Sequence, residues 1–372
     1  MQKIGKIVLL VPAPTAKGGI SYYYESLRNE LPQDVIFFER GARNWPQRTG
    51  FFGELKRIFS DFRLFRSLVR KEKISLVQSS TSLGVLTTLR DGIFLKYSQS
   101  KGIKTIAFFR GWDADVEKEI EEKYLKMFKF FFFSCDVLMS LSQHVKGKLQ
   151  SWGFEKEIFV ETTLVDKTLL SAIGQQQIVE RHNNAFATSN FEILFMSRIE
   201  QRKGIYECLS AFSQLQEKYR GKINFKFNIL GDGFERDSVE KFIEIQKIEN
   251  VFLPGFIKGD QKGQYLKTAN IFLFPSYGEG MPNAVLEAMA AGVVTITTPV
   301  GGLVDFFMHR EHGLIVAKPD AGLLVDAVEK VLFEKELSIR MAIKAHNYAK
   351  ANFFSDAVAG RLMKIFNFTI RK

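Results

Sequence analysis

The chain has few of the residues that build metal centres or disulfide frameworks. Only two cysteines, Cys135 and Cys208, occur in 372 residues, and their separation matches neither a metal-ligand spacing nor a disulfide pattern. The five histidines are scattered, with no cysteine or carboxylate at a spacing that would hold a metal ion. We therefore expect a reducing, cytoplasmic environment and a site that requires neither a metal nor a cofactor.

Long apolar runs are also missing. The phenylalanine run at residues 130–133 is far shorter than the ~18–20 apolar residues of a membrane span. The apolar stretch at residues 3–12 is equally short and leads into prolines and glycines, so it predicts a first buried strand rather than a signal peptide. We expect no membrane-spanning helix.

Positive charge is in excess and unevenly spread. The formal net charge is +11, and residues 1–170 carry 27 Lys and Arg against 19 Asp and Glu, a net of +8. Residues 40–73 alone hold ten basic and three acidic side chains. Such a surface attracts anionic membranes, nucleic acids or phosphate-bearing ligands. A nucleic-acid-binding protein is the weakest of these interpretations, because the chain has no zinc-finger spacing and no RNP-like aromatic signature.

The length fits two domains of ~150–200 residues, and short apolar runs alternate with amphipathic stretches throughout. This alternation predicts an α/β fold with two Rossmann-like domains, each a parallel sheet covered by helices on both faces. We expect strands at residues 4–11, 35–38, 75–78, 105–109, 137–141, 158–161, 191–196, 223–230, 251–253, 271–275, 293–297 and 314–316. We expect helices at residues 20–31, 52–70, 84–97, 116–131, 143–152, 206–219, 234–248, 260–268, 282–291, 303–308, 321–333 and 336–372, the last with a break near residue 354.

The polar stretch at residues 166–190 has weak periodicity and predicts a linker between the two domains. In open α/β sheets, ligands bind in the crevice at the carboxyl ends of the strands. Residues that follow strands directly are therefore the candidates for chemistry.

The strongest candidate motif follows the expected strand at 271–275. Glu279 lies in the loop before a helix that opens near Pro282, and Glu287 lies eight positions further on. The free N–H groups at such a helix start favour oxygen-rich ligands, and two carboxylates can accept hydrogen bonds from sugar hydroxyls. The alternative is a surface helix with two solvated acids.

A second motif follows the expected strand at 191–196, where Arg198 and Lys203 flank a short loop. A forked guanidinium and a compact ammonium suit a diphosphate, although solvated basic residues are the alternative. Glycine loops follow other strands at 18–19, 231–233 and 301–302, and each is either a close approach to a ligand or a tight turn. Arg110 and Asp113 follow the strand at 105–109, where Asp113 alternatively caps the next helix.

Together these motifs resemble the family 4 retaining glycosyltransferases of the GT-B fold, in which two Rossmann-like domains face each other across a cleft. The run from Glu279 to Glu287 is similar to the E-x7-E motif of that family, and Gly18-Gly19 is similar to its N-terminal glycine loop. The resemblance implies an acceptor-binding domain at 1–170, a nucleotide-sugar-binding domain at 171–352, and a helix at 353–372 that packs back on the N-terminal domain.

The resemblance also implies roles for individual residues. Arg198 and Lys203 would neutralise the diphosphate, Glu279 would hold sugar hydroxyls, and Glu287 would bind the ribose. The remaining donor-binding residues implied are Gly18, Gly19, Gly231, Gly255, Phe256, Gly280, Met281, Pro282, Asn283 and Ala284.

One position departs from the family. Many members have His-Gly-x-Asp where this chain has Arg110-Gly-Trp-Asp113. Arginine does not deprotonate in proteins and cannot act as a general base, but it can orient a donor sugar or an acceptor phosphate. Arg110 and Asp113 therefore remain candidate catalytic residues.

The implied function is retaining transfer of a sugar from a UDP- or GDP-linked donor to a saccharide or lipid-linked acceptor in cell-surface polysaccharide synthesis. Another GT-B activity, an inverting transferase or a nucleotide-sugar epimerase, is the alternative. The basic, phenylalanine-containing helix expected at 52–70 either lies on the inner face of an anionic membrane or packs its rings into its own domain.

Overall fold

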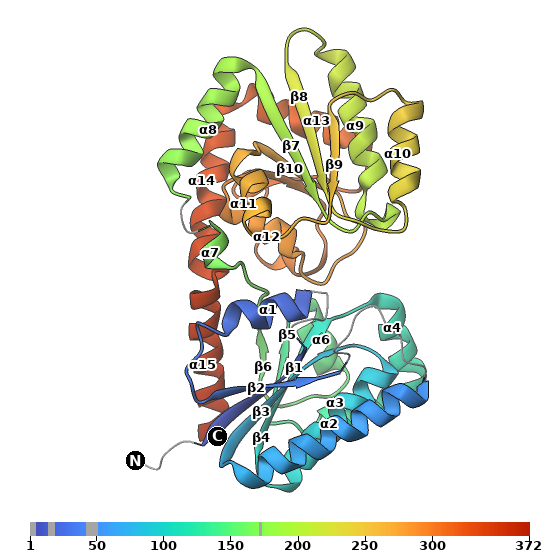
Figure 1. Cartoon of the computed structure of the whole chain (residues 1–372), viewed down its shortest axis with the longest axis vertical. Helices are drawn as coiled ribbons and strands as arrows, with labels where there is room; N and C mark the ends of the chain where they lie inside the picture. The colour runs from blue at the N-terminus through green and yellow to red at the C-terminus, as the bar shows by residue number, and fades with distance from the viewer. Residues whose placement is uncertain (1–4, 14–18, 42–50, 171–172) are drawn as a thin grey trace. The chain divides into compact units, whose positions relative to one another are not determined.

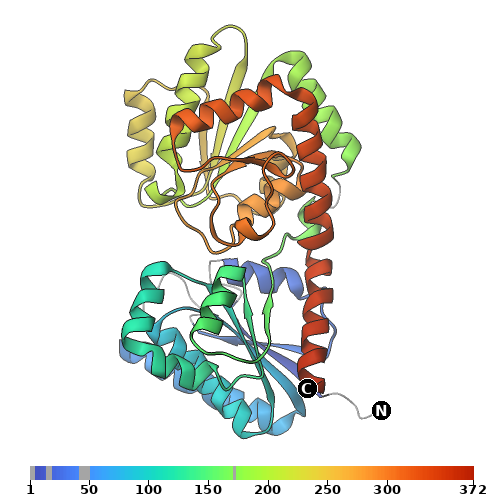
Figure 2. The same ribbon diagram turned by 180° about the vertical axis from the view of Figure 1, so that it is seen from behind.

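The computed structural model describes residues 5–13, 19–41, 51–170 and 173–372, and these residues form two compact units (Figures 1 and 2). The N-terminal unit comprises Met1–Thr163 together with Ser355–Lys372, and the C-terminal unit comprises Leu164–Phe354. The chain therefore passes between units after Thr163 and again after Phe354, near the predicted divisions at residues 170 and 352. In the described part of the chain, no helix combines the length and apolar character needed to cross a membrane.

The N-terminal unit contains a six-stranded parallel sheet in the order β2-β1-β3-β4-β5-β6. Its central strands are buried on both faces, which is why they are continuous apolar runs rather than alternating ones. The strands are β1 (Lys6–Pro12), β2 (Val35–Arg40), β3 (Ile74–Ser82), β4 (Lys104–Gly111), β5 (Val137–Ser140) and β6 (Ile158–Val160).

Helices cover both faces of this sheet. One core cluster joins the sheet to α2, α3, α5 and α6, while α1 packs with α15. The helices are α1 (Gly19–Leu27), α2 (Phe51–Lys71), α3 (Val85–Ser100), α4 (Ala114–Glu119), α5 (Leu125–Phe132), α6 (Gln143–Ser151) and α15 (Ser355–Arg371). The helix expected at 116–131 is divided, because a π-helical turn at Ile120–Tyr124 separates α4 from α5.

Phenylalanine provides much of this core. Phe65 of α2 and Phe94 of α3 are buried, and their ring centroids lie 5.2 Å apart. The ring of Phe38, on β2, lies 5.4 Å from that of Phe65. Aromatic pairs at such spacings stabilise a core beyond the area they bury, so the abundance of phenylalanine has a packing role here.

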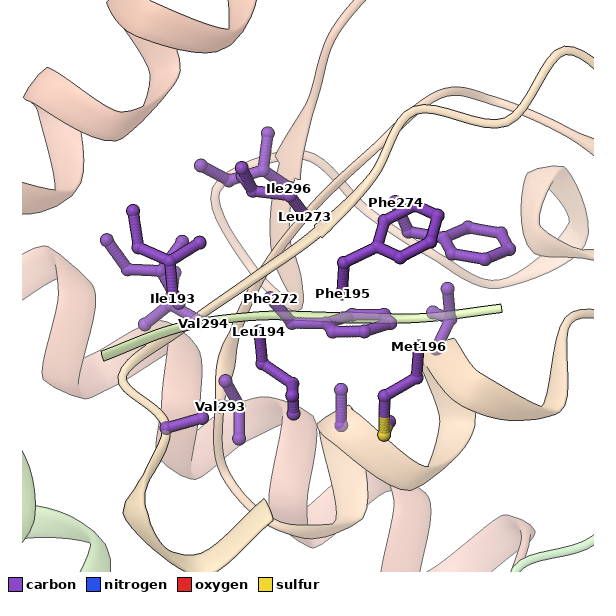
Figure 3. Close-up of a cluster of buried hydrophobic side chains, with 14 of the residues drawn as sticks. Ile193, Leu194, Phe195, Met196, Phe272, Leu273, Phe274, Val293, Val294 and Ile296 are labelled. Carbon is purple, nitrogen blue, oxygen red and sulfur yellow. The ribbon is translucent and has the colours of Figure 1, made fainter. Parts of the chain in front are cut away.

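The C-terminal unit has a second six-stranded parallel sheet, in the order β12-β11-β10-β7-β8-β9. Its strands are β7 (Asn190–Met196), β8 (Asn224–Leu230), β9 (Val251–Gly255), β10 (Ile271–Phe274), β11 (Val294–Thr297) and β12 (Gly313–Ile315). Figure 3 shows its core, where apolar side chains of β7, β10 and β11 pack together. The predicted fold class is confirmed for both units.

Apart from α7 and α8, which were not expected, the helices of this unit lie close to the expected positions, and α13 has the predicted limits. They are α7 (Lys167–Leu170), α8 (Gln175–Thr188), α9 (Ile205–Lys218), α10 (Arg236–Ile245), α11 (Gly259–Thr268), α12 (Asn283–Ala290), α13 (Ala321–Phe333) and α14 (Lys335–Asn352). The helix expected at 303–308 is instead a short 3₁₀ helix at Gly301–Asp305.

The prediction of a linker at 166–190 was wrong, because most of that stretch is α8. This helix packs against α14, and Ile178, His182 and Ala185 on it are buried. Arg181 donates hydrogen bonds to the carbonyl oxygens of Leu266, Lys267, Ala291 and Gly292. A guanidinium can satisfy the terminal carbonyls of several elements at once, so α8 is an integral part of the C-terminal unit.

Candidate active site

The site residues of the C-terminal unit gather where its strand order reverses. Parallel α/β sheets open a ligand crevice at such a reversal, at the carboxyl ends of the strands. Here the reversal lies between β7 and β10, which are hydrogen-bonded neighbours. The loop after β7 carries Arg198 and Lys203, and the loop after β10 carries Glu279. Topology therefore brings together the two motifs that are separated by about 80 positions in the sequence.

An ion pair joins these two loops. The ammonium Nζ of Lys203 lies 2.5 Å from Oε1 of Glu279, and the two side chains are 5% and 17% exposed. Ser276 Oγ lies 3.3 Å from the same carboxylate oxygen and is fully buried. Low exposure strengthens the electrostatic attraction between the ammonium and the carboxylate. The pair therefore holds both charged groups in place at the carboxyl ends of the strands.

Glu287 forms a second pair, which the sequence did not predict. It lies inside α12 and is buried, and its Oε1 accepts a hydrogen bond from Lys262 Nζ on α11 at 2.6 Å. A buried carboxylate needs such a partner to remain ionised at low cost. Lys262 is 25 positions away and belongs to no motif, so the sequence contained no signal for it.

Arg198 differs from Lys203 in its exposure. Its side chain is 63% exposed, and its Nη1 lies 2.7 Å from Oε1 of the buried Glu200. The other oxygen of Glu200 is 2.6 Å from Nε of Arg202. Glu200 thus orients two guanidinium groups, a role that its position two residues from each arginine could have indicated.

Glycines let the loops around this site approach one another. A Cβ on Gly301, whose φ is +53°, would lie 2.2 Å from the carbonyl oxygen of Gly280. The next residue, Gly302, donates its N–H to that same oxygen at 2.7 Å. A Cβ on Gly231 would lie 1.8 Å from the carbonyl oxygen of Ser197. Gly301 and Gly231 therefore cannot be replaced without a clash, and they bring the loop after β11 against the loop after β10 and the loop after β8 against the loop after β7.

The helix that carries Glu287 begins one residue later than expected. Pro282 is the residue before α12, and its carbonyl accepts the N–H of Val285 at 3.1 Å. The first N–H groups of α12, from Asn283 and Ala284, have no partner within the helix and favour an anionic or oxygen-rich ligand. Gly280 and Met281 precede this start directly, in the same loop as Glu279.

Two predicted donor-binding residues, Gly255 and Phe256, lie at and directly after the end of β9. Gly255 adopts a φ of +87° and accepts the N–H of Gly231 through its carbonyl at 2.9 Å. Phe256, which follows, exposes 65% of its side chain. An exposed ring beside the strand ends is a surface on which a nucleobase can stack.

In the N-terminal unit, Arg110 is the second-last residue of β4 and is partly buried. Its guanidinium carbon lies 3.5 Å from the ring centroid of Tyr23, and its Nη2 donates to Thr163 Oγ1 at 3.1 Å. Its Nε and Nη1 are buried and have no hydrogen-bond partner in the described part of the chain. Burial raises the pKa of Tyr23, while the positive charge of Arg110 opposes that rise. Unpaired buried donors are rare and point to a missing partner.

The other N-terminal candidates contribute less to a site. Asp113 is exposed and caps α4, accepting the N–H groups of Asp115 and Val116 at 3.0 and 3.2 Å. This is the capping role that was the alternative for this residue. Gly19 is exposed and begins α1, while Gly18 lies outside the described residues. In the described ranges, no group of three or more metal-ligating side chains is placed to hold a metal ion.

Comparison with known proteins finds glycosyltransferases that are similar to this chain. Residues 176–348 match the family model of the group 1 glycosyl transferases. A Methanocaldococcus jannaschii protein named as an uncharacterized glycosyltransferase is 24% identical, over 85% of this chain and 80% of that protein. The capsular polysaccharide biosynthesis glycosyltransferase CapM of Staphylococcus aureus is also 24% identical, over 85% of this chain and 81% of CapM.

Two solved structures share the fold along nearly the whole chain. Sucrose-phosphate synthase from Thermosynechococcus elongatus superposes with a TM-score of 0.74 at 17% identity, covering 98% of this chain and 99% of that one. Anabaena HepE, in complex with UDP and glucose, gives a TM-score of 0.72 at 15% identity with the same coverage.

The two parallel sheets, each flanked by helices, define a protein of the GT-B class. Within this class the chain is a glycosyltransferase, and the model of the group 1 glycosyl transferases matches most of its C-terminal unit.

Proposed function

We propose that this protein is a retaining, family 4 glycosyltransferase that moves a sugar from a UDP- or GDP-linked donor to a hydroxyl of a saccharide or lipid-linked acceptor. The observation that carries the proposal is the Lys203–Glu279 pair at the strand reversal of the C-terminal unit. The pair places an ammonium next to a carboxylate. In a nucleotide-sugar donor the diphosphate is next to the sugar, so Lys203 can bind the diphosphate while Glu279 binds the sugar hydroxyls. CapM, a relative in capsular polysaccharide biosynthesis, supports a role in cell-surface polysaccharide synthesis.

The ion pair supports an exchange of partners on donor binding. Without donor, the Glu279 carboxylate neutralises the Lys203 ammonium. A diphosphate carries more negative charge than one carboxylate and competes for the ammonium. Glu279 then accepts hydrogen bonds from sugar hydroxyls, while Glu287 accepts them from the ribose.

Catalysis in this scheme is chiefly electrostatic. The glycosidic bond to the diphosphate breaks with oxocarbenium-like charge on the sugar, and negative charge grows on the leaving diphosphate. Lys203, Arg198 and the first N–H groups of α12 offer positive potential that is already oriented for this charge. The acceptor hydroxyl attacks from the face that the diphosphate leaves, and the departing phosphate takes its proton. Because cationic side chains hold the diphosphate, we expect transfer to persist in EDTA.

Arg110 serves the sugar side of the reaction in this proposal. Its two unpartnered guanidinium nitrogens are donors that hydroxyl oxygens of a sugar can satisfy. Because arginine stays protonated, it orients and polarises but takes no proton.

We further propose that the N-terminal unit lies on the inner, anionic face of the cytoplasmic membrane. Of the α2 rings, Phe65 is buried in the core but Phe59 is 72% exposed. Exposed apolar side chains continue on neighbouring helices at Leu86, Leu89, Ile93 and Phe130. Exposed basic side chains accompany them on α2 at Lys56, Arg63, Arg66, Arg70 and Lys71. Apolar anchors with a basic surround suit an anionic bilayer.

The deciding experiment has two stages. A thermal-shift screen of UDP- and GDP-sugars identifies the donor, because a ligand that binds only the folded state raises its stability. NMR of the product formed from that donor then gives its anomeric configuration. A retained configuration is expected. An inverted product would replace the proposal with an inverting transferase, and isomerisation of the donor without transfer would replace it with an epimerase.

A further inference from the structure

Arg236 is a charged residue at the rim of the donor-binding unit that belongs to none of the predicted site motifs. It is the first residue of α10, the helix that follows β8. A helix that follows a strand of a parallel sheet begins at the carboxyl ends of the strands, where ligands bind. Arg236 therefore lies on the same edge of the sheet as the other site residues of the C-terminal unit.

The guanidinium group of Arg236 is held in place from two sides. Its Nε donates to Oε1 of Glu240, one turn further along α10, at 2.9 Å. Its Nη2 donates to the carbonyl oxygen of Leu253, on β9, at 2.9 Å. Its Nη1 has no hydrogen-bond partner among the described residues, and the side chain is 31% exposed. A donor group of fixed position is thus available at the surface.

This available donor lies beside Gly255, one of the residues predicted to bind the donor. A Cβ on Gly255, whose φ is +87°, would lie 3.2 Å from Nη1 of Arg236. Because glycine has no side chain, the guanidinium can lie close to the backbone at the end of β9. A ligand that contacts Gly255 on this side is within hydrogen-bonding reach of Nη1.

Exposed aromatic rings lie in both loops at this place. Phe256 directly follows Gly255 and is 65% exposed, and Phe234 lies two residues before Arg236 and is 81% exposed. Their loops follow β8 and β9, which are neighbours in the sheet (Figure 1). The N–H of Gly231 joins the two loops by donating to the carbonyl of Gly255 at 2.9 Å. Exposed rings beside a fixed donor suit a flat aromatic ligand with an acceptor on its edge.

We propose that Arg236 determines which nucleobase the donor carries, because its Nη1 donates a hydrogen bond to a keto oxygen of the base. This inference rests on the proposed function, in which the C-terminal unit binds a nucleoside diphosphate sugar. A guanidinium offers donors and no acceptor. It therefore matches O4 of uracil or O6 of guanine, and it opposes the amino groups of cytosine and adenine. The site selects uracil- or guanine-linked donors over cytosine- or adenine-linked ones.

The first test compares bases of equal size by calorimetry on the full-length chain, with UDP against CDP and GDP against ADP. We expect the wild type to bind the keto nucleotide of one pair about tenfold more tightly than its amino counterpart. In Arg236→Met this preference should be lost, because binding of the keto nucleotide weakens. Lys241→Met, which removes an exposed charge from the same helix, is the control and should keep the preference. Equal affinities within both pairs for the wild type overturn the proposal.

A structural role for Arg236 makes a different prediction. If the residue only supports β9 through the Leu253 carbonyl, Arg236→Met should weaken binding of all four nucleotides by the same factor, and this outcome contradicts the proposal. In the transfer assay, Arg236→Met should raise KM for the donor about tenfold and change kcat less than twofold. A fall in kcat at unchanged KM would likewise contradict a role in base recognition.

A further measurement needs no altered protein. Replacing the keto oxygen with sulfur, in 4-thio-UDP or 6-thio-GDP, leaves a weak acceptor on the same ring. The wild type should bind the thio analogue of its preferred nucleotide about fivefold more weakly, because a hydrogen bond to a charged donor is lost. Equal binding of the oxo and thio forms by the wild type overturns the proposal even if Arg236→Met does not fold.

The proposed function and the proposed role of Arg236 can fail separately. A keto preference that depends on Arg236, without any sugar transfer, would remove the transferase function and keep the base site. Sugar transfer with a base preference that survives in Arg236→Met would remove the role of Arg236 alone. Failure of the wild type to bind any of the four nucleotides would overturn both.

Discussion

Glu287 and Lys262 form a largely buried ion pair between α12 and α11, with Oε1 and Nζ 2.6 Å apart. The carboxylate is 5% exposed and the ammonium side chain 17%. Glu287 is the proposed ribose ligand, and Lys262 has no counterpart among the predicted site residues. The carboxylate proposed to bind the ribose is therefore already neutralised by an ammonium group.

Removing one member of this pair should destabilise the fold more than removing both. We expect Lys262→Met to lower the free energy of unfolding by about 3 kcal/mol, because it leaves a buried carboxylate uncompensated. The double variant Lys262→Met/Glu287→Leu should recover at least half of that loss. Chemical denaturation of the four proteins of this cycle measures the effect. A double variant no more stable than Lys262→Met would show that the pair is not coupled as described.

Loss of the diphosphate-binding cations should slow transfer strongly. We expect Lys203→Ala and Arg198→Ala each to lose ~2–4 kcal/mol of transition-state stabilisation, about 30- to 900-fold in kcat/KM. Lys241→Ala, which removes an exposed charge from α10, is the matched control and should retain full activity. Steady-state kinetics with the donor found by thermal shift gives the values. Undiminished transfer in both variants would show that Lys203 and Arg198 do not stabilise the leaving diphosphate.

The stability of the C-terminal unit should fall as the solution becomes acidic. Burial lowers the pKa of His182 to about 4 from its ordinary 6.5, and the adjacent Arg181 lowers it further in the same direction. The folded state therefore binds its proton less readily than the unfolded state, so stability is full above pH 6.5 and declines down to pH 4. For this pKa shift, the free energy of unfolding should fall by about 3 kcal/mol between pH 6.5 and pH 4.

His182→Gln isolates this contribution, because glutamine can keep the hydrogen bond that Nε2 makes with the Gly292 carbonyl at 3.1 Å. Urea denaturation at several pH values should show a shallower decline for the variant between pH 6.5 and 4. Parallel curves for the two proteins would assign the acid sensitivity to other groups.

Membrane association should depend on both charge and exposed apolar side chains. In flotation with anionic liposomes, we expect wild-type protein to float at low salt and to dissociate as salt screens the basic residues of α2. Phe59→Ser combined with Leu89→Ser should reduce flotation at every salt concentration. Phe234→Ser, at a site 81% exposed in the C-terminal unit, is the control and should float as wild type does. Flotation that does not change with salt, or an equal loss of flotation in Phe234→Ser, would contradict the proposed membrane association.

The expected strands and most of the helices could be read from the sequence for a definite physical reason. Strands such as β1 and β7 are buried on both faces, so each appears as an unbroken apolar run between turn residues. The prediction failed at α8, whose polar composition resembles a linker. Its helical state depends on a few contacts, including the burial of Ile178 and the carbonyl bonds of Arg181. Such contacts have no local periodic signature.

The sequence alone therefore determined the α/β class and the identity of the candidate acids and cations, because burial and strand-following loops leave a local pattern. Only the tertiary structure decided the partners of those residues. It set Lys203 against Glu279 and Lys262 against Glu287. The reason is that parallel strands distant in sequence become neighbours in a sheet, so the groups that meet at their ends are chosen by topology rather than by spacing along the chain.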